Sequence, residues 1–175
     1  MTTQNSPSSR IHGAASQRRL RGFTLIEILV VIAIMGILAS IAVPGFRDMI
    51  TGQKVRGVAN DLYAALLYAR SEAMKRNGQV SVVRSATGWA DGWTVQFTSG
   101  ALTLQTQAVD SSSVTVTGPA AASVIFGGNG RPLAASSGAS FKVYATGIAA
   151  RCITLNLSGM PDVKVDTDGN PANGC

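Results

Sequence analysis

The chain has 175 residues, enough for one domain, and 46% of them are hydrophobic, which is typical of a folded protein. Its formal net charge of +6 does not point to nucleic-acid binding by the folded part, because four arginines precede Gly22 in a segment without acidic residues. Without that segment 11 basic residues remain against 9 acidic ones, and basic residues beside an apolar segment are explained by holding that side of the chain in the cytoplasm.

The first 22 residues are polar and basic, and an apolar run follows from residue 23 to residue 43, FTLIEILVVIAIMGILASIAV. Glu27 is the only charged residue of this run. As a helix the run would be about 31 Å long, enough to cross the hydrocarbon core of a bilayer. Pro44 follows directly and is expected to kink or interrupt the helix, since its ring removes a backbone hydrogen bond.

Residues 44–77 have the pattern of an amphipathic helix that continues the apolar one. Apolar side chains recur at steps of three and four, which predicts one buried face: Val55, Val58, Leu62, Leu66, Ala69 and Ala73. Asn77-Gly78 is a good signal for the end of this helix.

Residues 78–175 switch to a period of two and are expected to form a β-rich head. The predicted strands are Gln79 to Arg84, Trp93 to Thr98, Leu102 to Gln107, Val114 to Thr117, Ser123 to Phe126, Phe141 to Ala145, Cys152 to Leu157 and Val163 to Val165. Turn signals separate them, among them Ala90-Asp91-Gly92, Ser99-Gly100, residues 127–130 (GGNG) and residues 158–161 (SGMP). This spacing predicts an antiparallel sheet or a pair of sheets against the amphipathic helix, an α+β fold.

Cys152 and Cys175 are the only cysteines, and their spacing fits no zinc or redox motif. Both follow the membrane segment and so should lie outside the cytoplasm, where a disulfide that ties down the tail is favoured over two unpaired thiols. Such a bond would contribute roughly 3 kcal/mol by the chain-entropy estimate.

No set of catalytic, cofactor-binding or metal-binding residues is apparent. The single histidine, His12, precedes Gly22. Asp166, Asp168 and Asn170 alternate as in a fragment of a calcium loop, but the downstream Glu is missing and Gly169 is misplaced. We therefore expect neither an enzyme nor a metalloprotein.

Residues 21–27, RGFTLIE, lead into the apolar run, and the whole arrangement resembles the class III signal of type IV pilins and type II secretion pseudopilins. The resemblance implies cleavage between Gly22 and Phe23 by prepilin peptidase and N-methylation of Phe23. It also implies that Glu27 pairs with the Phe23 amine, largely that of a neighbouring subunit, during assembly. The alternative for Glu27 is a carboxylate that reaches the cytoplasmic interface of the membrane.

An ordinary secretory signal is the competing interpretation, because Ser40-Ile41-Ala42 has the small-x-small form of a signal peptidase site. That reading conflicts with Glu27 inside the apolar run and with the length of the run. It predicts a mature protein that starts at Val43.

Within the pilin-like proteins the chain is similar to the GspH/FimT group. The similarity lies in residues 62–73 (LYAALLYARSEA), in residues 89–93 (WADGW) and, more loosely, in residues 125–132 (IFGGNGRP). It implies the type IV pilin fold. From the residues themselves, we expect Arg70 and Glu72 to be solvated or paired on the helix surface, and Trp89 and Trp93 to anchor the sheet.

The resemblance leaves three roles open. A minor pilin at the tip or initiating complex of a type IV pilus is favoured, because the two cysteines resemble the tail disulfide of some minor pilins; a type II secretion pseudopilin is the alternative. Both imply other pilins or pseudopilins as partners and a single pass through the bacterial inner membrane, with the head in the periplasm. A DNA-uptake receptor is the third role, but residues 159–164 (GMPDVK) lack the arginines of the corresponding motif, and Asp162 would repel phosphate.

Overall fold

The computed structural model describes residues 22–99, 102–110 and 112–166. The chain divides into two units, Met1–Ser40 and Ile41–Cys175, and each is described by itself. A helix, α1, spans Leu25–Lys75, a length of 51 residues. The predicted apolar and amphipathic helices are therefore one element. The helix is not interrupted at Pro44, so only a kink remains as a prediction for that residue.

The C-terminal end of α1 is closed by a left-handed residue. Asn77 has a φ of 45°, and the N–H of Gly78 donates to the carbonyl of Ala73 at 3.1 Å. This six-to-one hydrogen bond is the Schellman arrangement, which satisfies a carbonyl that the helix itself leaves unpaired. The predicted stop at Asn77-Gly78 is confirmed, with Asn77 as the residue that takes the left-handed conformation.

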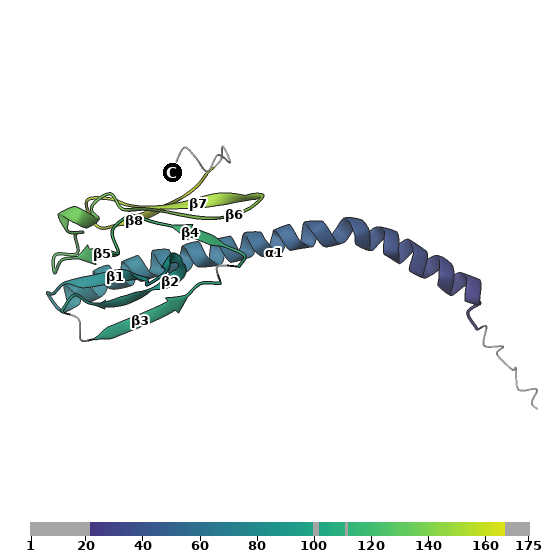
Figure 1. Ribbon diagram of the computed structural model, residues 1–175, viewed down its shortest axis with the longest axis horizontal. Helices are drawn as coiled ribbons and strands as arrows, with labels where there is room; N and C mark the ends of the chain where they lie inside the picture. The colour runs from purple at the N-terminus through teal and green to yellow at the C-terminus, as the bar shows by residue number, and fades with distance from the viewer. Residues whose placement is uncertain (1–21, 100–101, 111, 167–175) are drawn as a thin grey trace, which may run out of the picture. The chain divides into compact units, whose positions relative to one another are not determined.

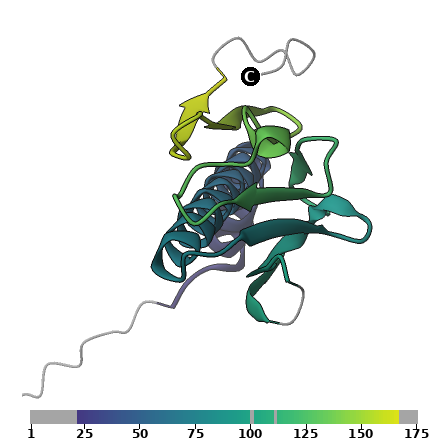
Figure 2. The ribbon, with the colours of Figure 1, turned by 90° about the vertical axis from the view of Figure 1, so that its left-hand side faces the viewer.

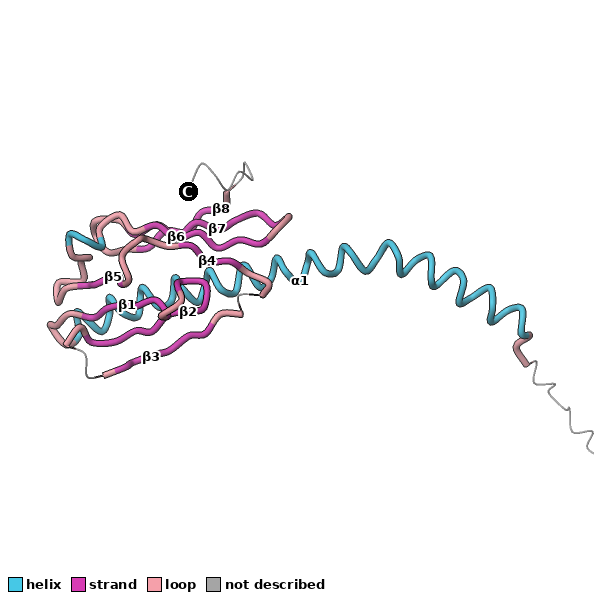
Figure 3. Tube along the Cα trace, viewed as in Figure 1, coloured by secondary structure: helices cyan, strands magenta, loops and turns pink. Residues whose placement is uncertain are grey.

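The described residues after α1 form eight strands and one short 3₁₀ helix (Figures 1 and 3). Their bounds are β1 Val80–Ser85, β2 Gly88–Phe97, β3 Thr103–Ala108, β4 Thr115–Thr117, β5 Ser123–Phe126, η1 Ala134–Ser136, β6 Ser140–Ala145, β7 Ile148–Leu155 and β8 Pro161–Val165. Two four-stranded sheets result, with strand orders β3-β2-β1-β5 and β4-β6-β7-β8. All the strand pairs are antiparallel, so the predicted α+β fold with a pair of sheets is confirmed.

The turn predicted at Ala90-Asp91-Gly92 is wrong, because these residues lie inside β2. The turn between β1 and β2 comes earlier, at residues 86–87. Gly92 has a φ of 113°, and a Cβ at this position would run into the Gln107 backbone of β3. The glycine thus marks a close approach of two strands, which is a recognised meaning of Gly within a strand. The short helix η1 was not predicted.

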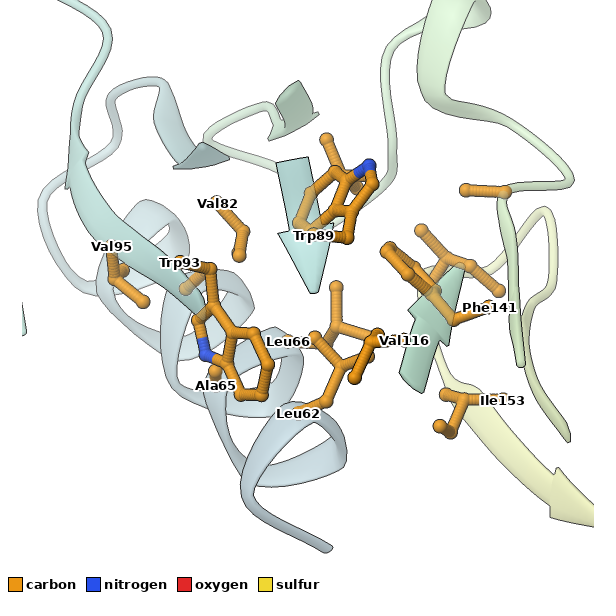
Figure 4. Close-up of a cluster of buried hydrophobic side chains, with 14 of the residues drawn as sticks. Leu62, Ala65, Leu66, Val82, Trp89, Trp93, Val95, Val116, Phe141 and Ile153 are labelled. Carbon is orange, nitrogen blue, oxygen red and sulfur yellow. The ribbon is translucent and has the colours of Figure 1, made fainter. Parts of the chain in front are cut away.

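One hydrophobic core joins the buried face of α1 to both sheets (Figure 4). The helix contributes fully buried Leu62, Ala65 and Leu66. Trp93 and Val82 come from the first sheet, and Phe141 and Ile153 come from the second. Figure 2 shows α1 lying beside the strands of the head. The core side chains on α1 recur at helical spacing, so the predicted stripe is confirmed, although Val58 is only partly buried.

The two tryptophans are anchors of this core, as the sequence predicted. Both are buried, with exposed fractions of 5% for Trp89 and 2% for Trp93. Trp89 donates from Nε1 to the Pro119 carbonyl at 3.2 Å and meets the Phe141 ring edge to face, with ring centroids 4.9 Å apart. Edge-to-face contact is a favoured aromatic geometry, and here it ties a strand of the first sheet to a strand of the second.

Gly118 lies so close to this aromatic pair that no side chain fits there, which gives a first prediction. A Cβ at Gly118 would lie 2.7 Å from Trp89 Cδ1 and 2.8 Å from Phe141 Cδ1. We expect Gly118→Ala to lower the free energy of unfolding by about 1–3 kcal/mol, the usual cost of overpacking a core. Urea unfolding of the detergent-solubilised chain measures it, since both tryptophans of the chain lie in the head and report on it by fluorescence.

Gly57 provides the matched control for this substitution. It is exposed within α1, with no atom within 4 Å of an added Cβ, so Gly57→Ala should stabilise the helix by about 0.5–1 kcal/mol. Equal effects of the two substitutions would contradict the packing account of Gly118.

Candidate functional site

The first turn of α1 is built by the residues of the RGFTLIE motif. Thr24 precedes the helix, and its Oγ1 accepts a hydrogen bond from the backbone N–H of Glu27 at 3.2 Å. The Thr24 carbonyl accepts from the N–H of Ile28 at 3.3 Å, the first helical bond. Thr24 is therefore the N-cap. Glu27 lies in the first turn, where a negative charge interacts favourably with the helix dipole.

This local role of Thr24 and Glu27 was missed in the sequence, although its signal is present. The spacing Thr-x-x-Glu at the start of an apolar helical run is that of a capping box. The predictions for Glu27 were a partner in assembly or a carboxylate at the membrane interface, and neither included the helix start. In the structure, residues 24–27 also set the start of the helix, two residues after the predicted cleavage point.

The predicted cleavage point lies in an exposed, non-helical segment just before that cap. Gly22 and Phe23 are both exposed, with Phe23 exposed by 78%, and neither belongs to α1. A peptidase needs accessible backbone, and residues 22–24 are exposed and lie outside the helix. The cleavage and the methylation of Phe23 themselves stay predictions.

No part of the described chain covers the apolar surface of α1 that follows the predicted cleavage point. Every residue from 22 to 43 is exposed. Large apolar side chains occur on all sides of the helix, among them Leu25, Ile26, Val30, Met35 and Ile41. Among the described residues α1 is the one helix long and apolar enough to cross a membrane, with a mean hydropathy of 2.8 in its most apolar window. Exposed apolar surface on this scale marks contact with lipid or with another protein.

Glu27 is the one charge on this surface, and no ion pair to it is present among the described residues. A carboxylate in an apolar, membrane-spanning helix is costly and usually has a partner. Within the described residues, the Glu27 carboxylate thus has no cation as an ion-pair partner, and the Phe23 amine of a neighbouring subunit is predicted to be that partner. That pairing stays a prediction.

In the head, Arg70 connects the end of α1 to two loops, and Glu72 is paired within the end of the helix. Arg70 donates from Nε to the Gly130 carbonyl at 3.0 Å, and its Nη1 lies 2.9 Å from the Met160 sulfur. Glu72 has a side chain only 9% exposed and forms ion pairs with Arg76 at 3.0 Å and Lys75 at 3.5 Å. The expected pairing thus holds for Glu72, whereas Arg70 forms polar contacts with a carbonyl and a sulfur instead of an ion pair.

Two glycines allow the segments that meet around Arg70 to approach one another closely. Gly130 and Gly159 both have positive φ values, and a Cβ on Gly159 would collide with the Gly130 carbonyl. Because the Gly130 carbonyl also accepts from Arg70, three segments far apart in the sequence meet at one point. In the 125–132 stretch, Gly130 therefore has a structural role.

The environment of Glu72 predicts a pH dependence of stability. Burial alone would raise its pKa, but the hydrogen bond from Arg76 and the charge of Lys75 outweigh burial and hold the pKa below 4.5. A carboxyl with a lowered folded-state pKa contributes stability that is present above its unfolded pKa and is lost as pH falls through the folded pKa. We expect Glu72→Gln to be less stable than the parent at pH 7. The difference in the free energy of unfolding should shrink as the pH falls below 4.5 towards about 3, because the carboxyl becomes protonated there.

Chemical unfolding followed by tryptophan fluorescence between those two pH values measures this difference. Asp48→Asn is the control, since Asp48 is exposed on α1 and forms no ion pair among the described residues. A difference between Glu72→Gln and the parent that stays constant with pH would contradict the ion-pair account.

A buried ion pair that the sequence did not suggest fastens the end of β8. Lys142 on β6 lies 3.1 Å from Oδ2 of Asp166, and each side chain is 8% exposed. The backbone N–H of Asp166 also donates to the Ala150 carbonyl at 2.9 Å. Asp166 thus has a structural role instead of the calcium-loop role considered for it; Asp168 and Asn170 lie outside the described residues.

The remaining predicted site residues are Cys152 and Cys175. Cys152 lies on β7, is buried and is not a free thiol. Cys175 lies outside the described residues, so the bond between the two stays a prediction. In the stretch compared with DNA-binding motifs, Lys164 is already paired with Asp162 at 3.7 Å, which leaves little positive charge there for phosphate.

Comparison with known proteins decides the family. The model of the type II transport protein GspH matches residues 58–159, more than half of the chain, and the prokaryotic N-terminal methylation motif matches residues 17–43. The chain belongs to the GspH family. The family match covers the buried end of α1 and the head up to residue 159, before β8, and the motif match covers the predicted cleavage point and the apolar run.

Individual relatives of this GspH-family chain are a type IV pilin and a fimbrial protein. A type IV major alpha-pilin of Moraxella bovis is 50% identical over 44 residues, 25% of this chain and 28% of the relative. A fimbrial protein of Pseudomonas aeruginosa is 34% identical over 82 residues, 47% of this chain and 51% of the relative. The chain thus spans about half or less of the length of these curated relatives.

The fold is shared with a solved minor pilin. The crystal structure of the type IV minor pilin FimU of Pseudomonas aeruginosa superposes with a TM-score of 0.55 at 20% identity, over 67% of this chain and 92% of that one. The predicted type IV pilin fold is confirmed by this match.

Proposed function

We propose that this GspH-family chain is a minor pilin, made as a precursor and incorporated into the tip or initiating complex of a type IV pilus. Prepilin peptidase would cut between Gly22 and Phe23, and the new N-terminus at Phe23 would be methylated. Residues 1–22 are then the removed leader, residues 23–43 the membrane and assembly helix, residues 44–77 its amphipathic continuation and residues 78–175 the head. The role is structural, and it requires no cofactor.

One observation carries the proposal: an apolar helix surface that nothing in the described chain covers, with Glu27 as its only charge. Before assembly, lipid covers such a surface, so the chain would be held in the inner membrane by a single helix with its head in the periplasm. After extraction, only other apolar helices can cover it equally well. A bundle of pilin helices provides that cover and lets Glu27 meet the Phe23 amine of a neighbour.

The filament content of the native bacterium tests this proposal. Sheared surface filaments should contain the chain at low abundance, detected by an antibody against the head. Immunogold labelling should place it at filament ends. Its absence from filaments, with all of it retained in the cell envelope, would contradict the pilus role.

A type II secretion pseudopilin is the second candidate, supported by the description of the matching family as a type II transport protein. Deletion of the gene separates the two roles. Loss of surface pili with normal protein secretion supports the minor pilin, whereas loss of secretion with normal pili supports the pseudopilin.

A further inference from the structure

The second sheet, β4-β6-β7-β8, has one face towards the core and one face away from it. Phe141 on β6 lies directly opposite Ile153 on β7, and both side chains belong to the hydrophobic core. Lys142, Cys152 and Lys164 form the neighbouring row across β6, β7 and β8. Because successive side chains of a strand point to opposite faces, this row lies on the face turned away from the core, which we call the outer face.

The centre of the outer face is buried all the same. Cys152 is 4% exposed, and Ala150, two residues away on the same face, is 6% exposed, although neither belongs to the core cluster. The side chains of Lys142 and Asp166 are each 8% exposed. The side chain of Lys164, at the edge of the same row, is 74% exposed. Lysine is rarely buried to this degree, so the centre of the outer face has a cover that does not reach its edge.

No described helix or strand provides this cover. Figures 1 and 2 show α1 on one side of β6, β7 and β8 and no α-helix or strand of the described residues on the other, and η1 packs on β5 of the first sheet. Of the segments outside the described residues, 100–101 and 111 are too short to cover a sheet face, and 1–21 precede the membrane helix. Residues 167–175 remain. They follow Asp166 directly and end at Cys175, and Cys152 in the centre of the outer face is not a free thiol.

We propose that residues 167–175 fold back over the outer face of the second sheet and are fastened there by a disulfide between Cys175 and Cys152. The segment is long enough, because a chain of this length can span about 30 Å, whereas Cys152 lies on the strand next to β8 and neighbouring strands are about 5 Å apart. The sequence of the segment, TDGNPANGC, is mostly polar, as suits a cover that has one side in water. A disulfide favours the closed arrangement, because it restricts the open chain more than the closed one.

The cover makes the burial of the Lys142–Asp166 ion pair depend on oxidation. Closing the bond transfers two electrons and two protons from the thiols of Cys152 and Cys175 to the disulfide of an oxidant protein, which becomes a dithiol. Such oxidation takes place outside the cytoplasm, where the proposed function places the head. Without the bond the segment can leave the sheet, and the ion pair is then open to water and to salt, which screens it. The inference rests on the proposed position of the head and not on the pilus role.

Acetylation of lysine amines in the detergent-solubilised chain, purified from its native membrane, tests the cover. Peptide mass spectrometry follows Lys142 and, as the matched control in the same row, Lys164. In the oxidised protein we expect Lys142 to react at least about ten-fold more slowly than Lys164, because its amine reacts only when the cover opens. After reduction, or in Cys175→Ser, the rate of Lys142 should approach that of Lys164, while Lys164 stays unchanged. Equal protection of Lys142 in all three samples, a free Cys175 thiol, or a bond from Cys152 to a second copy would overturn the inference.

A second measurement keeps the test decisive if Cys175→Ser unfolds the head, which the fluorescence of the buried tryptophans would reveal. A photocrosslinking amino acid at Ala172 of the oxidised chain should join residue 172 to β6 or β7 of the same chain. The same amino acid at Thr87, which is exposed in the turn between β1 and β2, should give no such crosslink. Crosslinks from residue 172 to other parts of the head alone, or none, would overturn the inference. None of these measurements uses filaments, so such a result leaves the minor pilin role intact, and failure of that role leaves the cover standing.

Discussion

Glu27→Ala should leave membrane insertion and cleavage intact and reduce the chain in sheared filaments by at least about ten-fold, since removing one partner of a buried ion pair is strongly destabilising. The variant helix is more apolar than the parent, and an isolated carboxylate opposes burial in lipid, so insertion should not suffer. Assembly is different. In a helix bundle the amine of a neighbouring Phe23 would be desolvated, and without Glu27 it has no counter-charge. Membrane fractionation and immunoblotting of sheared filaments measure the two steps separately.

The capping geometry calls for a control that separates two roles of the first turn. Thr24→Ala removes the hydroxyl that accepts from the Glu27 N–H and should weaken the helix start by about 0.5–2 kcal/mol, while it keeps the carboxylate. We expect this variant to assemble far better than Glu27→Ala. Equal losses would show that Glu27 acts through the helix start, and normal incorporation of Glu27→Ala would contradict the assembly role.

Lys142→Met should destabilise the head by about 3–5 kcal/mol, the cost of leaving one member of a buried ion pair without its partner. Both side chains are 8% exposed, and the Lys142 ammonium is the cation that the described structure places against the Asp166 carboxylate. Methionine keeps most of the volume of the lysine stem, so the loss should come from the stranded carboxylate. Urea unfolding of the detergent-solubilised chain by tryptophan fluorescence provides the measurement.

The double variant Lys142→Met/Asp166→Leu is the matched control. Replacing both members of a buried pair by apolar residues is often neutral or stabilising, so the double variant should recover most of the stability that the single variant loses. A single variant as stable as the parent, or a double variant no more stable than the single one, would contradict the stabilising role of the Lys142–Asp166 ion pair.

The sequence predicted those features that depend on one continuous pattern. The length of α1 follows from an apolar run joined to a regular stripe, and its end follows from Asn77-Gly78. The strands followed from alternation, with errors of a few residues at their ends. Thr24 and Glu27 have the spacing of a capping box, so the start of the helix was also predictable from the sequence.

Features that depend on contacts between distant residues were not predictable in this way. Gly92 has the composition of a turn, and only the neighbouring β3 backbone shows that it serves a close approach within β2. Lys142 and Asp166 lie on separate elements, and nothing in their local sequence pairs them. The buried outer face of the second sheet likewise appears only once the strand pairing is known, because the cover of a sheet face is a property of the folded head and not of the strand.

The mature N-terminus tests the central claim most directly. Mass spectrometry of the protein purified from its native membrane or filaments should show a chain that begins at Phe23 with one methyl group on its amine. A chain that begins at Val43, as cleavage by signal peptidase would give, or one that retains residues 1–22 would contradict the account. With Phe23 exposed directly before the Thr24 cap, we expect the first result.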